Sequence, residues 1–167
     1  MRLLGAGLLW TSLICAGVAY SVKLKFRVEL LEKTKLMIEE IKMQLNFLNL
    51  PVYEIMKSIS KKDYLNKLVY INDICNMIEE GKDFHFAWLT ALENTYLPYK
   101  SEEIERLLHI GSNLGVSDTD NQISMLTLNS KYFDEYIAKA KQQNKKYGNL
   151  TMTLGALSGC TIFILLL

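Results

Sequence analysis

The residues of this chain that could do chemistry are few, and they lack the spacing that chemistry needs. His85 and His109 have no carboxylate or cysteine at metal-ligand spacing. Three pairs of adjacent carboxylates occur in helical patterns, at Glu39-Glu40, Glu79-Glu80 and Glu102-Glu103. Neighbouring side chains of a helix point about 100° apart, so these pairs are expected to form solvated faces. No serine or cysteine lies in a nucleophile elbow, and the sequence predicts no catalytic residue, no metal and no cofactor.

The most distinctive polar segment contains Gly111, Gly115, Asp118 and Gln122. A phosphate-binding loop places its glycines between a strand and a helix and adds a lysine, whereas these glycines join two helical patterns and no lysine follows. Tight helix closure followed by a polar cap accounts for each residue. We therefore predict a structural turn, and the exposed surface near it is a candidate docking site for a partner.

Tyr96 and Tyr99 flank Pro98 in a segment that is expected to be an exposed loop. Aromatic side chains in such a loop could anchor a partner chain. They could equally fold back and close the end of a helical bundle. The sequence leaves both alternatives open.

Both ends of the chain are apolar runs. Residues 3–22 and 150–167 carry no charged residue. As helices they would span roughly 27–30 Å, which matches a hydrocarbon core of about 30 Å. We predict an N-terminal and a C-terminal transmembrane helix around one domain of residues 23–149. The first run exceeds the usual apolar core of a cleavable signal peptide, about 7–15 residues, so an uncleaved anchor is expected.

Small residues mark one face of each predicted span. Gly155 and Gly159 are four residues apart, and Ser12 and Ala16 repeat this spacing in the first span. Such pairs allow close packing of membrane helices. A contact within one chain and a homo-oligomer both stay open. Neither span has an ionisable residue, which counts against a transporter.

Charge sets the expected orientation and excludes one class of partner. Basic residues flank both predicted spans on the domain side, at Lys23, Lys25, Arg27, Lys139, Lys141, Lys145 and Lys146. By the positive-inside rule, the domain faces the cytosol. Residues 23–149 carry 18 Lys/Arg and 18 Asp/Glu. This balance argues against a nucleic-acid partner, and no motif indicates a small-molecule substrate.

Periodic apolar residues predict an all-helical domain. The first span should continue as a helix toward Asn49, and Pro51 suits the first position of the next helix. Asp63 is expected to cap a third helix that ends at Gly81, and Asp83 a short fourth helix.

Two further helices complete the expected bundle. Ser101 is expected to cap the fifth, and Ser117 with Asp120 to form a capping box for the sixth. No segment alternates with period two. The fold class is therefore all-α, a bundle of about six helices whose first and last helices extend into the membrane.

These residues resemble the stage III sporulation protein AB family along the whole chain. The family pattern Leu-Gly-x-x-Leu-Gly-x-x-Asp-x-x-x-Gln is matched by Ile110-Gly111, Leu114-Gly115, Asp118 and Gln122. A second pattern is matched loosely by Gln44-Leu45, Phe47 and Leu50-Pro51-Val52. Gln44 and Phe47 stand where the family tends to have Glu and Tyr.

The resemblance implies a non-enzymatic platform subunit of a secretion-like channel between mother cell and forespore. It further implies a soluble part like the cytoplasmic domain of type II secretion platform proteins, on the mother-cell side of the membrane. The implied partners are a secretion-type ATPase and other stage III sporulation channel components. A membrane-tethered adaptor without a channel role is the alternative, and a membrane-bound enzyme or transporter is a more distant one.

Overall fold

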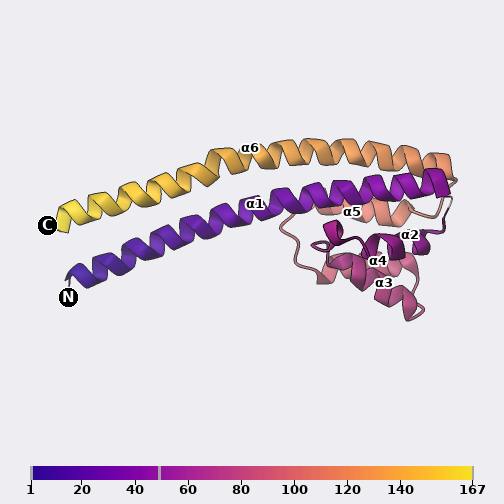
Figure 1. Cartoon of the computed structure of the whole chain (residues 1–167), viewed down its shortest axis with the longest axis horizontal. Coiled ribbons are helices and arrows are strands. Elements are labelled where there is room, and N and C mark those ends of the chain that lie inside the picture. Colours follow the sequence, from indigo (N-terminus) through magenta and orange to yellow (C-terminus); the bar gives the residue numbers. More distant parts are fainter. Residues whose placement is uncertain (1, 49, 167) are drawn as a thin grey trace. The chain divides into compact units, whose positions relative to one another are not determined.

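The computed structural model describes the backbone of residues 2–48 and 50–166 and the side chains of residues 12, 15–48 and 50–147. The regular secondary structure of this part of the chain is helical, with no strand, which confirms the all-α helical-bundle part of the predicted fold class (Figure 1). The extension of the first and last helices into a membrane stays a prediction. The six α-helices are α1 (Arg2–Leu48), α2 (Val52–Ser60), α3 (Tyr70–Glu79), α4 (Phe84–Asn94), α5 (Ser101–Asn113) and α6 (Thr119–Leu166). A short 3-10 helix, η1 (Asp63–Leu65), precedes α3.

The chain divides into two compact units. The terminal unit contains Met1–Val28 and Ala138–Leu167, and the bundle unit contains Glu29–Ile137. Helices α1 and α6 each contribute to both units. Residues 23–28 and 138–149, which the sequence placed in the soluble domain, are therefore grouped with the apolar ends.

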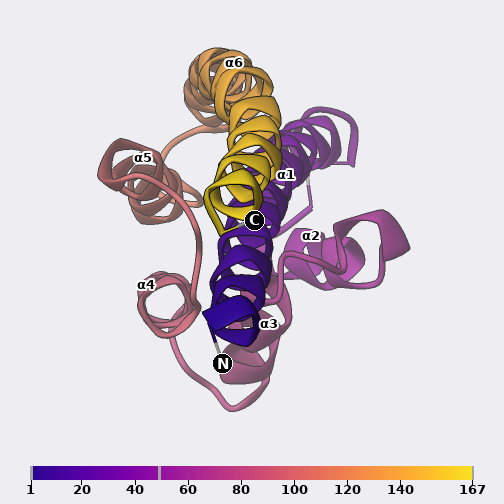
Figure 2. The same cartoon turned by 90° about the vertical axis from the view of Figure 1, so that its left-hand side faces the viewer.

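The core of the bundle unit is built on the second half of α1. Its buried residues recur every three or four positions, as expected for a helix that is packed along one broad face: Leu30, Leu31, Thr34, Met37, Ile38, Ile41, Gln44 and Leu45. The short helices lie beside this half of α1 (Figure 1), and α2, α3, α4 and α5 follow one another around the bundle (Figure 2). Phe133 and Leu126 of α6 are also fully buried.

Polar contacts hold α6 against α1 within the bundle unit. The Lys35 ammonium lies 2.6 Å from an Asp134 carboxylate oxygen, and the Ser130 hydroxyl donates to Glu39 at 2.5 Å. The paired residues run in opposite directions along the two helices. Helices α1 and α6 are therefore antiparallel in this unit.

The stop at Gly81 and the cap at Asp83 are present as predicted. Gly81 has φ +86°, and the Asp83 carboxylate accepts from the backbone N–H groups of His85 and Phe86.

The predicted start of the third helix was wrong. Asp63 begins the separate turn η1, and α3 starts at Tyr70. Backbone N–H groups of Asn66, Leu68 and Ile71 bond to carbonyls three residues earlier. Leu65 and Leu68 of this segment are buried in the bundle, and Lys62 and Lys67 bond to Glu40 and Glu29 of α1, so contacts with the rest of the bundle hold it in this irregular form.

Three further helix starts differ by one residue from the prediction. Pro51 precedes α2 as its cap residue, and Lys100, not Ser101, caps α5. The Lys100 N–H donates to Glu103 at 2.7 Å. At α6 the cap is Asp118, and the capping box expected from Ser117 and Asp120 was wrong, because Asp118 itself accepts from the Asn121 N–H.

The side chains of most residues in the two predicted spans, 3–22 and 150–167, lie outside the described part of the chain. Among the residues that are described, no helical stretch has the length and apolar character needed to cross a bilayer.

Candidate partner-docking surface

Just before the corner between α5 and α6, Gly111 of α5 makes a close contact with α4. A methyl group at this position would lie 2.1 Å from the Trp88 ring, so only glycine fits without a shift. The Trp88 indole N–H donates to the Leu107 carbonyl at 2.9 Å. His85 Nδ1 lies 2.8 Å from the Gly111 carbonyl oxygen, and since that oxygen can only accept, Nδ1 must donate. Gly111 therefore docks α5 on α4 rather than ending α5.

Gly115 and Gln122 close the corner by a pair of side-chain hydrogen bonds. Gly115 has φ +84°, which favours glycine. Its N–H donates to Gln122 Oε1 at 2.8 Å, and Gln122 Nε2 donates to the Ser117 carbonyl at 2.6 Å. One buried amide thus satisfies a donor and an acceptor of the connecting backbone.

The four predicted turn residues therefore come together at one corner. Gly111 and Gln122 are buried, and Asp118, although exposed, caps α6. Gly115, Asp118 and Gln122 form the connection to α6, whereas Gly111 lies within α5 and packs against Trp88. Their role in docking stays a prediction that concerns the exposed neighbours, such as Ser112 and Val116.

An apolar groove between α4 and α5 begins beside this corner. One hollow of about 290 Å³ is lined by His85, Phe86, Trp88, Leu89, Leu108 and Ser112. A second, of about 490 Å³, is lined by Leu92, Glu93, Asn94, Thr95, Tyr96, Leu97, Ile104 and Leu108. Leu108 lines both, so we treat the hollows as one feature, the α4–α5 groove. Sequence reasoning missed this groove.

The α4–α5 groove exposes large apolar side chains beside a carboxylate. Phe86 is 53% exposed and Leu89 is 44% exposed. Glu93, which is also exposed, lines the groove. The surface therefore suits a partner segment with apolar anchors and basic flanks.

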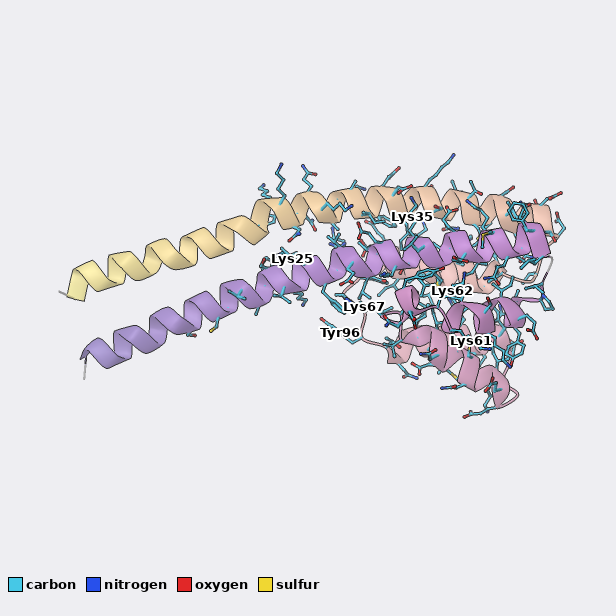
Figure 3. All side chains as sticks on the ribbon, viewed as in Figure 1. Lys25, Lys35, Lys61, Lys62, Lys67 and Tyr96 are labelled. Atoms are coloured by element: carbon cyan, nitrogen blue, oxygen red, sulfur yellow. The ribbon has the colours of Figure 1, made fainter. Side chains whose placement is uncertain are left out.

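The two loop tyrosines lie in opposite environments. Tyr96 is 75% exposed and projects from the loop between α4 and α5 (Figure 3). The Tyr99 hydroxyl lies 2.6 Å from Thr34 Oγ1 and donates to the Leu30 carbonyl at 3.1 Å. Burial raises the pKa of Tyr99 well above its ordinary value. Tyr99 thus closes the bundle, which was one of the two alternatives, and only Tyr96 is left as a candidate anchor.

The three pairs of adjacent glutamates were expected to form solvated faces, and this expectation was wrong for three of the six side chains. Glu103 is fully buried, and Glu39 and Glu40 are half-buried. Lys62 lies 2.5 Å from Glu40, which also accepts from the Tyr64 hydroxyl. Burial raises the pKa of Glu40, but these hydrogen bonds outweigh it and hold that pKa below its ordinary value.

The remaining predicted positions give less information. Ser12 and Ala16 are exposed, whereas Gly155 and Gly159 lie outside the residues whose side chains are described. Where side chains are described, no cluster of three or more His, Cys, Asp or Glu residues could hold a metal ion. Cys75 is a free cysteine, and burial raises the pKa of its thiol.

Together these features define an all-helical bundle protein with a glycine-tightened corner and an apolar surface groove. A family model described as stage III sporulation protein AB matches residues 2–167, and the chain belongs to that family. It therefore has a role in stage III of sporulation. No curated protein and no solved structure matches the chain significantly.

Proposed function

We propose that this chain is a non-enzymatic platform subunit of the channel between the mother cell and the forespore. Its apolar ends, residues 3–22 and 150–167, anchor it in the mother-cell membrane. Its bundle unit docks a secretion-type ATPase and other channel components on the cytosolic side. Family membership and the apolar composition of both ends support this proposal.

The observation that carries the docking part is the α4–α5 groove. Exposed Phe86 and Leu89 can bury large apolar area in a partner, and such anchors dominate binding energy. Exposed carboxylates of the same two helices, including Glu93, would steer a basic partner surface toward them. The groove also lies beside the corner that carries the family pattern, because Ser112 lines it.

Cross-linking in sporulating cells tests the docking surface. A photoreactive residue at Phe86 or Leu89 should capture the ATPase. The same residue at Leu128, which is also a large exposed apolar side chain, is the matched control and should not. Equal capture from Leu128 would show that the groove is not the docking surface.

A charge placed in the groove tests whether docking matters for function. Leu89→Glu should leave folding intact because the side chain is exposed, and it should abolish ATPase capture and sporulation. Leu128→Glu should sporulate normally. Normal sporulation of both variants would contradict the proposal.

Labelling of intact cells tests the orientation. With the native cysteines replaced by alanine, Ser112→Cys adds an exposed thiol to the bundle unit. A membrane-impermeant reagent should modify this thiol only after the cells are opened. Modification in intact cells would place the bundle unit outside.

A further inference from the structure

The two compact units have opposite charge. All 18 Asp/Glu residues of the chain lie within residues 29–137, the bundle unit, together with 11 Lys/Arg. The terminal unit has the other eight Lys/Arg and no acidic residue. The near-neutral total of +1 therefore combines a bundle unit of net charge −7 with a terminal unit of +8.

The positive charge of the terminal unit is accessible. Six lysines form what we call the basic collar, and all of them are exposed: Lys23, Lys25, Lys139, Lys141, Lys145 and Lys146. Figure 3 labels Lys25 on α1. Arg27 is buried and donates to Gln143 at 3.1 Å, which links the α1 and α6 segments of this unit.

Exposed aromatic and aliphatic side chains accompany the collar. Tyr20 is 46% exposed, Phe26 is 41% exposed and Tyr147 is 42% exposed. Val18 and Val22 are exposed as well. In water such side chains are costly to expose, whereas the interface of a bilayer accommodates aromatic rings at headgroup depth.

We propose that the basic collar binds the headgroups of anionic phospholipids. A cluster of lysines next to an apolar run attracts a negatively charged leaflet. The terminal unit has no Asp or Glu residue, so its net charge is strongly positive. A nucleic acid would use the same charge, but the exposed aromatic and aliphatic side chains beside the collar favour a lipid surface.

The inference rests on the membrane-anchoring part of the proposed function, and it adds a preference for one class of lipid. A bilayer of neutral lipids would bury the apolar ends but would offer no negative charge to the basic collar. The collar makes an anionic leaflet the preferred surroundings of the chain. The strength of this preference should fall as salt screens the charges.

Native mass spectrometry of the full chain tests the proposal. The chain is released from micelles that contain equal amounts of phosphatidylglycerol and phosphatidylcholine, and the bound lipids are counted. The wild-type chain should retain about tenfold more phosphatidylglycerol. The quadruple variant K23Q/K25Q/K145Q/K146Q should retain the two lipids nearly equally.

A matched variant controls for the loss of four charges. Lys61, Lys82, Lys100 and Lys131 are exposed lysines of the bundle unit, and K61Q/K82Q/K100Q/K131Q should keep the wild-type preference. An equal loss in both variants, or no preference in the wild type, would overturn the inference.

Two additions separate the lipid from other anions. Millimolar glycerol phosphate should not displace the bound phosphatidylglycerol, and displacement would indicate a simple phosphate site instead. Duplex DNA that competes better than the lipid would indicate a nucleic-acid site. ATPase capture, measured on the same variants, is a separate readout, so its failure would contradict only the proposed function.

Discussion

At the scale of single residues, contacts within the bundle explain why the family pattern has Gly111 and Gln122. Gly111 is required because the Trp88 ring occupies the space of a side chain. Gln122 is required because its amide bonds to both Gly115 and Ser117. Such residues are sensitive to substitution even when they touch no partner.

Gly111→Ala should destabilise the bundle by about 1–3 kcal/mol, because the added methyl group overlaps the Trp88 ring. Chemical denaturation followed by circular dichroism measures this loss. Ser112→Ala, at the exposed next position, should change stability little. In a Trp88→Leu background, Gly111→Ala should lower the free energy of unfolding by less than it does in the wild type. An equal loss in both backgrounds would show that overlap with the Trp88 ring is not the cause.

Gln122→Leu should lower the free energy of unfolding by about 1–3 kcal/mol, because the Gly115 N–H and the Ser117 carbonyl lose their hydrogen-bond partner. Ser124→Leu, at an exposed position of the same helix, is the control and should stay within about 0.5 kcal/mol of wild type. Equal unfolding midpoints for the two variants would show that the amide does not hold the corner.

At the scale of elements, ion pairs tie the connection before α3 to α1. Lys62 lies 2.5 Å from Glu40, and Lys67 lies 2.5 Å from Glu29. Lys67 belongs to the segment that the sequence predicted as helix and the structure forms from short turns, and Lys62 lies one residue before its predicted cap at Asp63. These contacts to α1 help to hold that irregular segment, and Lys62 and Lys67 can be located in Figure 3.

Glu40→Gln should lower stability at pH 7 by about 1 kcal/mol. Because the pKa of Glu40 is held below its ordinary value, the carboxylate stabilises the fold above about pH 4.3, the usual pKa of an unfolded glutamate. That contribution is lost as the pH falls through the folded-state pKa. The difference between wild type and variant should therefore narrow in acid, as urea unfolding at pH 7 and pH 3 would measure. A difference that is constant with pH would contradict this assignment, and Glu80→Gln, at an exposed site, is the control.

At the scale of the whole molecule, a buried tyrosine in the core makes the stability of the fold depend on pH. Tyr70 is fully buried, and its hydroxyl lies 3.5 Å from the Met37 sulfur. Burial raises the pKa of Tyr70 far above its ordinary value, so the fold favours the neutral phenol. Stability from this group is complete below about pH 10 and falls as the pH rises above that value.

Tyr70→Phe should therefore become more stable relative to wild type as the pH rises above about 10. Denaturant unfolding at pH 8 and pH 11 measures the change. Tyr96→Phe, at a position exposed before and after unfolding, should show no such trend. If Tyr70→Phe and wild type respond equally to alkali, the burial of this phenol does not govern alkaline stability.

The sequence alone determined the fold class and much of the helix order. Apolar periodicity predicted the bundle, and local hydrogen bonding predicted the stop at Gly81 and the cap at Asp83, because both depend on neighbours within a few residues. The predicted start of α3 was wrong, since contacts of residues 62–68 with the rest of the bundle hold that segment in short turns. The family pattern was found, but its physical reason was not.

Only the tertiary structure decided what depends on residues distant in the sequence. The Trp88 ring that requires Gly111, the α1 partners that hold Tyr99 inside, and the α4–α5 groove arise when separate helices pack together. The charges were visible in the sequence, yet their separation appeared only when contacts assigned residues 138–149 to the terminal unit. Periodicity reports which face of a helix is apolar, whereas the identity of the group that covers it is set by packing.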